Sequence, residues 1–294
     1  MDLTLTRRTF LAGSLAITST LALRSPSLAQ PYAVASHTRT ELLELALTLT
    51  DTGFELAQPL IAGRYHVTVK NNGTSPVSHF GFGKIPDSIT DAQYEEWLQS
   101  IGTDKERTDI LAFEDIAFVG VPDWPPPGGS ASGVVDIAPG RYLLFDPIGD
   151  RGATTVMVDG QPVDAVEPAS DLTVTLREMQ INLPDAAFTT APVRWKIENT
   201  GTMSHEVAIV PVDPAFTEDD LKLLFSLPED ATPPPGVPAF DYQPVAAIGI
   251  LAPGHTSWLD VQLKPGHYLG ACMLPFSTGY PHAMDGMYAF FDVA

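Results

Sequence analysis

The C-terminal end of this 294-residue chain carries a thiol, an imidazole and a thioether close together. Cys272 is the single cysteine, and His282 and Met287 follow it on one expected loop between two strands, while His205 follows an earlier strand. Thiolate and thioether sulfur favour Cu(I) and imidazole holds Cu(II), so two His, one Cys and a weak axial Met form the ligand set of a type 1 copper site. We therefore predict one copper ion, and its ligands are His205, Cys272, His282 and Met287.

Each of these residues also has an ordinary interpretation. A lone cysteine at a strand end is usually a small buried hydrophobe. Met287 fits a core position, and His205 fits a turn whose polar groups are satisfied locally. The combination favours the metal site, because the one cysteine of the chain is followed by His and Met on the same expected loop. A single cysteine also excludes an internal disulfide framework.

The strands that must position these residues belong to a pattern that occurs twice. Residues 64–70 and 193–198 alternate between apolar and polar side chains, and each run is followed by an Asn-x-Gly turn. His79 and His205 follow these turns, 126 positions apart, and the segments 138–143 and 264–269 match at the same offset. Two anchors at one offset indicate a duplication, and a period of this length indicates two domains.

Many short strands joined by turns are expected, because the chain has 23 glycines, 27 prolines and only 18% charged residues. We predict an all-β fold of two antiparallel β-sandwiches, over residues 38–162 and 170–294. Each holds one short helix, at 91–100 and 218–225, where apolar residues share one face. The proline-rich stretches 122–129 and 228–238 are expected to be loops that cross between sheets.

The first 29 residues have the layout of an export signal. Paired arginines at 7 and 8 precede Phe-Leu, an apolar stretch follows, and residues 27–29 form a small-x-small cleavage site. This resembles the twin-arginine motif and predicts a periplasmic or extracellular protein without a membrane span after cleavage. Cleavage would leave 13 basic and 35 acidic residues, a net charge of -22. The alternative is that the segment is kept as a membrane anchor.

Two motifs of the second half resemble the copper-binding signature of the cupredoxin family. They are Asn-x-Gly-x-x-x-His-Glu over residues 199–206, and Cys, nine residues, His, four residues and Met over residues 272–287. The end of the chain is similar to plastocyanin-like domains. The resemblance implies a Greek-key β-sandwich that carries single electrons, with an exposed ring edge of His282 as the electron port. The nine-residue spacing is longer than in small cupredoxins and closer to that of copper nitrite reductases.

The first half shares the strand pattern and lacks the site. At the offset of 126, Asp146 stands where the second half has Cys272, and no histidine follows it before residue 160. His79 alone cannot hold copper. We therefore expect this half to be structural or to offer a docking surface.

Several function classes are excluded or left open. Oxidase and nitrite reductase chemistry is not expected, because the chain has no His-x-His pair and Ala271 stands directly before Cys272. The net charge of -20 excludes nucleic acid as a partner and favours a cationic redox partner such as a c-type cytochrome. A copper storage or delivery protein and a metal-free binding module stay open as alternatives.

Overall fold

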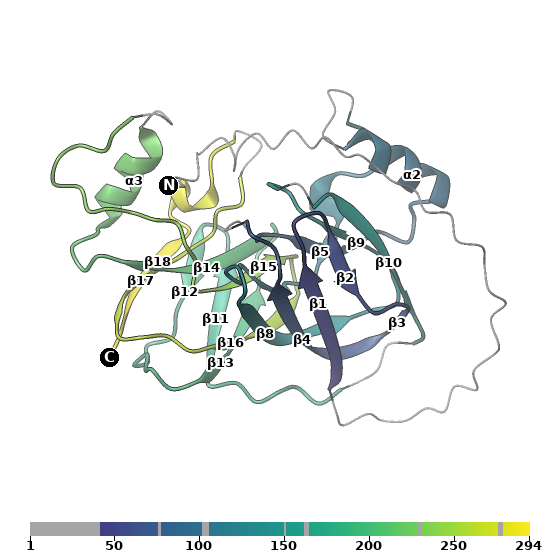
Figure 1. Ribbon diagram of the computed structural model, residues 1–294, viewed down its shortest axis with the longest axis horizontal. Coiled ribbons are helices and arrows are strands. Elements are labelled where there is room, and N and C mark those ends of the chain that lie inside the picture. Colours follow the sequence, from purple (N-terminus) through teal and green to yellow (C-terminus); the bar gives the residue numbers. More distant parts are fainter. Residues whose placement is uncertain are drawn as a thin grey trace.

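Figure 1 shows the computed structural model of the chain. The structure describes residues 42–75, 78–101, 106–149, 151–161, 165–227, 231–275 and 279–294. The expected signal over residues 1–29 lies outside the described residues, as do positions 228–230 of the second expected loop. Within the ranges just given, no helix is both long enough and apolar enough to cross a membrane.

The described elements are short strands with two α-helices and two 3₁₀ turns. The strands before residue 160 are β1 (Leu43–Leu49), β2 (Phe54–Leu56), β3 (Leu60–Ile61), β4 (Gly63–Asn71), β5 (Gly81–Lys84), β6 (Ala117–Phe118), β7 (Pro122–Asp123), β8 (Ser130–Ile137), β9 (Gly140–Phe145) and β10 (Ala153–Asp159). The strands after it are β11 (Leu172–Arg177), β12 (Gln180–Asn182), β13 (Val193–Asn199), β14 (His205–Val212), β15 (Ala246–Leu251), β16 (Thr256–Val261), β17 (Gly266–Ala271) and β18 (Tyr288–Val293). The helical segments are α2 (Asp91–Ser100), η1 (Phe113–Asp115), α3 (Glu218–Ser226) and η2 (His282–Asp285).

One sheet runs through both halves of the chain. Its eight strands have the order β12-β11-β13-β16-β8-β4-β1-β2, and β16 of the second half pairs antiparallel with β8 of the first. Figure 1 shows these two strands near the middle of the molecule. Two five-stranded sheets, β3-β10-β9-β5-β6 and β18-β17-β14-β15-β7, complete the structure. The second of these includes β7, which comes from the first half and pairs with β15.

A separate apolar core lies under each half of the long sheet. Leu47, Val67 and Val135 from β1, β4 and β8 pack with Tyr142 and Val156 from the β9–β10 sheet. In the second half, side chains from β11, β13 and β16 pack in the same way with those from β14, β17 and β18. The prediction of an all-β fold built from two sandwiches is confirmed. The domain boundaries at 38–162 and 170–294 stay predictions.

Each five-stranded sheet carries one helix on its outer face (Figure 1). Helix α2 buries Tyr94 and Trp97, and α3 buries Leu221 and Leu224. Both helices begin with a capping box, in which a threonine side chain accepts from the backbone of the third helical residue. The prediction of a helix at 91–100 is confirmed, and the second helix extends one residue beyond the predicted 218–225.

Two details differ from the expected antiparallel sandwiches. The first long strand of each half is parallel to its neighbour, since β1 pairs with β4 and β11 with β13 in the same direction. Parallel neighbours need a connection that returns the chain to the same end of the sheet. The segment with β2 and β3 makes this connection between β1 and β4, and the segment with β12 makes it between β11 and β13. The expected loop at 122–129 starts with β7, so its first two residues are a strand rather than a loop.

Candidate metal centre

The four predicted ligands lie at one end of the β18-β17-β14-β15-β7 sheet. His205 is the first residue of β14, and Cys272 follows directly after β17. Because β14 and β17 pair antiparallel, the start of β14 and the end of β17 lie at the same end of the sheet. His282 begins η2, and Met287 directly precedes β18. The segment between β17 and β18 therefore brings His282 and Met287 back to the same end of the sheet.

The turn before His205 is held by one asparagine side chain. Asn199 accepts a hydrogen bond from the backbone N–H of Gly201 (3.0 Å) and donates through Nδ2 to the carbonyls of Met203 and Leu251, both at 2.8 Å. These bonds tie the turn to β15 and satisfy a buried amide completely on its donor side. The asparagine of the sequence motif thus sets where β14, and with it His205, begins.

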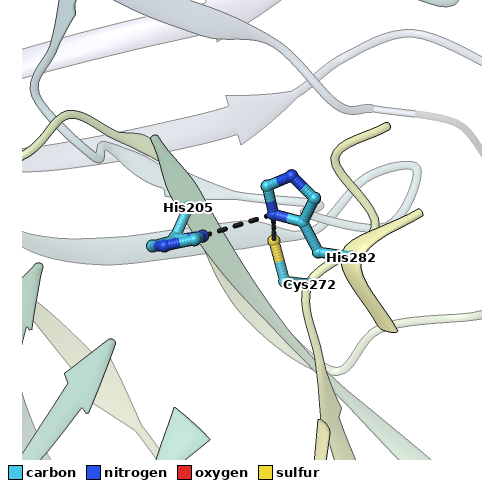
Figure 2. Close-up of side chains that lie close together, drawn as sticks. All are labelled: His205, Cys272 and His282. Carbon is cyan, nitrogen blue, oxygen red and sulfur yellow. Dashed lines mark hydrogen bonds between the residues drawn. The ribbon is translucent and has the colours of Figure 1, made fainter. Parts of the chain in front are cut away.

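Ligand atoms of three of these residues converge, as Figure 2 shows. Nδ1 of His205 lies 3.3 Å from Nδ1 of His282, and Sγ of Cys272 lies 3.4 Å from Nδ1 of His282. The side chains are almost completely buried, with exposed fractions of 0% for His205 and Cys272 and 2% for His282. Two imidazole nitrogens and a thiol sulfur within 4.8 Å of one another form a cluster that can hold a metal ion.

The ligand loop is closed by backbone hydrogen bonds. Cys272 N–H donates to the carbonyl of Met287 and Met287 N–H to that of His282, each at 3.1 Å. Ala283 N–H donates to the carbonyl of Cys272, and His282 N–H to that of Leu274, each at 2.9 Å. The side chain of Met287 is fully buried and belongs to the same apolar core as Cys272. All four predicted residues therefore lie together, with His205, Cys272 and His282 in direct polar contact.

The protonation states of His205 and His282 are those needed to bind a metal cation. Burial, followed by the neighbouring His282, lowers the pKa of His205 to about 4, and burial also lowers the pKa of His282. Both imidazoles are therefore neutral at pH 7, as metal ligands must be. Burial raises the pKa of Cys272, so the sulfur carries a proton until a cation replaces it. The mixed sulfur and nitrogen donor set fits copper in both of its oxidation states.

A carboxylate that the sequence did not point to supports the same turn. Glu178, in the turn between β11 and β12, accepts hydrogen bonds from the backbone N–H groups of Thr202 and Met203. The bond from Thr202 is the main reason that its pKa falls to about 2. Gly201 leaves space for this carboxylate, since a Cβ there would overlap with Oε1 of Glu178. Oε1 also lies 3.9 Å from Nε2 of His205.

The expectation of an exposed ring edge at His282 is wrong. Its side chain is 2% exposed, and the 3₁₀ turn η2 begins with this residue. The hydrogen bond from Ala283 to the carbonyl of Cys272 draws this helical turn inward. The imidazole of His282 is therefore buried where an exposed port was expected.

At the matching place in the first half, a salt bridge stands where the second half has its cluster. Asp146 is fully buried, accepts from the backbone N–H groups of Ile148 and Gly149, and pairs with Nη1 of Arg151 at 2.8 Å. Its charge is thus neutralised by a guanidinium. Among the described residues, His205, Cys272 and His282 are the one group of three or more potential ligands whose donor atoms all lie within 4.8 Å of one another.

No protein-family model matches the chain, nor does any curated protein sequence. Among solved structures, the chain is similar to reduced auracyanin from the photosynthetic bacterium Roseiflexus castenholzii, at 23% identity over 43% of this chain and 99% of auracyanin, with a TM-score of 0.27. An azurin from the methylotroph Methylomonas sp. strain J is 16% identical over 42% of this chain and 95% of its own (TM-score 0.26). A multicopper oxidase is 12% identical over 87% of this chain and 93% of the oxidase chain, with a TM-score of 0.24. With TM-scores this low, the matches carry no argument about function.

Proposed function

We propose that this chain is a copper-binding member of the cupredoxin family that carries single electrons. The ligands of its type 1 site would be His205, Cys272, His282 and Met287. The observation that carries the proposal is the convergence of two imidazole Nδ1 atoms and one Sγ atom among buried side chains. When bound, copper would supply a one-electron couple between Cu(II) and Cu(I).

The residues of the chain give this site a rigid frame. Asn199 holds the turn before His205, and the backbone bonds among Cys272, His282 and Met287 close the ligand loop. Burial of all four side chains excludes water from the pocket. A ligand set that is held in place when the charge of the site changes by one unit is suited to electron transfer, since little of the surrounding structure must move.

The acidic character of the chain favours a cationic redox partner, such as a c-type cytochrome. The net charge of -22 after cleavage, from 13 basic and 35 acidic residues, attracts such a partner over about 10 Å at moderate salt. The transfer rate should then fall as ionic strength rises. Because His282 is closed to solvent, the electron would cross the covering loop rather than leave from an exposed imidazole.

Export by the twin-arginine route to the periplasm or the outside is part of the same proposal. It predicts a mature chain that begins at Gln30 and is released in soluble form. Mass spectrometry of the exported protein tests this directly. A mass that includes residues 1–29, found in the membrane fraction, would support the retained anchor instead.

The deciding experiment adds one equivalent of Cu(II) to the mature protein and records visible absorption, EPR and voltammetry. An intense thiolate-to-copper band with a reversible potential, both lost in Cys272→Ser, is the expected result. Stoichiometric Cu(I) binding without a reversible potential would favour storage or delivery. A protein that binds no copper would favour the metal-free module and refute the proposal.

A further inference from the structure

A buried charged cluster lies behind the metal centre and joins the two halves. His79 comes from the first half, just before β5, and its Nδ1 lies 2.5 Å from Oδ2 of Asp123 in β7. Its Nε2 lies 3.5 Å from Oε2 of Glu206, the residue next to His205 in β14. All three side chains of the cluster, Asp123, His79 and Glu206, are at most 4% exposed.

The surroundings hold the His79 imidazole in one place. Asp123 also accepts from the backbone N–H of Trp124 at 2.8 Å, and its strand is paired with β15. Gly249 in β15 leaves the space that the carboxylate occupies, since a Cβ there would lie 3.2 Å from Oδ2 of Asp123. Trp124 has a φ of 56°, an unusual conformation for a bulky residue, and its ring stacks on His79 with centroids 5.6 Å apart.

Glu206 connects this cluster to both sides of the metal-binding cysteine. Its Oε1 accepts a hydrogen bond from the backbone N–H of Met273 at 3.1 Å, and its own backbone N–H points to Sγ of Cys272 at 3.5 Å. One residue therefore contacts the sulfur and the peptide that follows it. The position of the Glu206 carboxylate matters for the position of Cys272.

The charges explain why a histidine is needed here. Burial alone would lower the pKa of His79, but Asp123 and then Glu206 outweigh burial and raise it to about 9. The imidazolium lies between two carboxylates that would otherwise be buried without a cation. The cluster is therefore an ion-pair network with a histidine at its centre, unlike the group of His205, Cys272 and His282, whose donor atoms all lie within 4.8 Å of one another.

We infer that His79 of the first half is a positioning residue of the metal centre in the second half, acting through Glu206 on the segment that holds Cys272. His79 stands 126 positions before His205, at the equivalent place of the repeat. The histidine of the half without ligands thus supports the half that has them. The inference deepens the proposed function and rests on it for the effect on copper, while the effect on the thiol stands by itself.

The test uses the accessibility of the single thiol in the metal-free protein. The rate at which Ellman's reagent modifies Cys272 reports how often its segment opens, and no other cysteine contributes. His79→Leu should raise this rate about tenfold or more, because it leaves two buried carboxylates without their cation. Arg151→Met is the matched control, since it breaks the other buried ion pair of the first half and leaves the contact between His79 and Glu206.

A second background shows whether His79 acts through Glu206. In Glu206→Gln, the further change His79→Leu should raise the thiol rate by a smaller factor than it does in the wild-type background, because only Asp123 is then left without its cation. His79→Gln keeps a hydrogen-bond donor for one carboxylate, so Cys272 should react more slowly in it than in His79→Leu. If His79→Leu does not fold, His79→Gln replaces it in the comparison with Arg151→Met and with Glu206→Gln. In copper-loaded protein, the same variants should shift the charge-transfer band and the EPR hyperfine splitting, whereas the control should not.

Equal thiol rates in His79→Leu and Arg151→Met would overturn the inference, because a general loss of stability would then explain both. The inference would also fail if His79→Leu had the same effect with and without Glu206. Failure of the wild-type protein to bind copper would refute the proposed function alone, since the thiol rates would still decide the role of His79.

Discussion

Raising the pH from 6.5 to 9 should destabilise the metal-free protein through His79. In the unfolded chain this imidazole loses its proton near pH 6.5, whereas in the folded protein it keeps the proton up to a pKa of about 9. Over this interval the folded state binds one proton more than the unfolded state, so its stability falls with pH. A difference of about 2.5 pH units at about 1.4 kcal/mol per unit gives a loss of about 3 kcal/mol.

Urea unfolding at a series of pH values measures this loss, and His79→Gln is the control. Burial raises the pKa values of Asp123 and Glu206, so between their unfolded and folded pKa values these carboxyl groups also make stability fall as the pH rises. The thiol of Cys272 also ionises more readily in the unfolded chain near the upper limit, but it is present in both proteins. The difference between wild type and variant therefore isolates the His79 cluster. A free energy of unfolding that stays level from pH 6.5 to 9, or falls equally in the variant, would refute the reasoning.

Three further substitutions test the frame of the metal centre. Met287→Ala should lower the free energy of unfolding of the metal-free protein by about 2 to 5 kcal/mol, because the side chain is fully buried; a smaller loss in urea unfolding would mean that the loop closes around the gap. Gly201→Ala should displace the carboxylate of Glu178 and weaken copper binding in a competition titration, and an affinity equal to that of wild type would show that the turn does not need this carboxylate. Asn199→Ala should cost about 1 to 3 kcal/mol by leaving the buried carbonyl of Leu251 without its donor, and an unchanged thermal midpoint would contradict this account.

Much of the local structure was predictable from the sequence. The alternation over residues 64–70 and 193–198 corresponds to β4 and β13, because residues two apart on a strand face the same core. The Asn-x-Gly turns and the spacing from Cys272 to Met287 also pointed to the residues of the His205, Cys272 and His282 cluster. These patterns are local, so they can be found without knowledge of what lies next to each strand. The metal binding itself stays a prediction.

The parts that escaped prediction depend on neighbours far away in the chain. An alternating pattern shows which face of a strand is buried, but not which strand lies beside it, so the pairing of β8 with β16 was not visible. Glu178 and Asp123 are acidic residues in a turn and in a two-residue strand, and nothing local separates them from solvent-exposed acids. The burial of His282 accompanies the packing of η2, the turn that begins with this residue, against Cys272, and the loop length alone does not specify that packing.

The pairing of β8 with β16 also determines how the protein comes apart. If one half opened alone, the backbone N–H and C=O groups at 133–135 or 257–259 would lose their partners along an edge in the middle of the sheet. Opening of either half is therefore penalised by the other, and the two repeats should melt in one cooperative transition. A chain reduced to its second half would keep every predicted copper ligand and still differ from a free-standing one-sandwich protein. It would present β16 as an uncovered edge strand and tend to associate with other copies of itself through that strand.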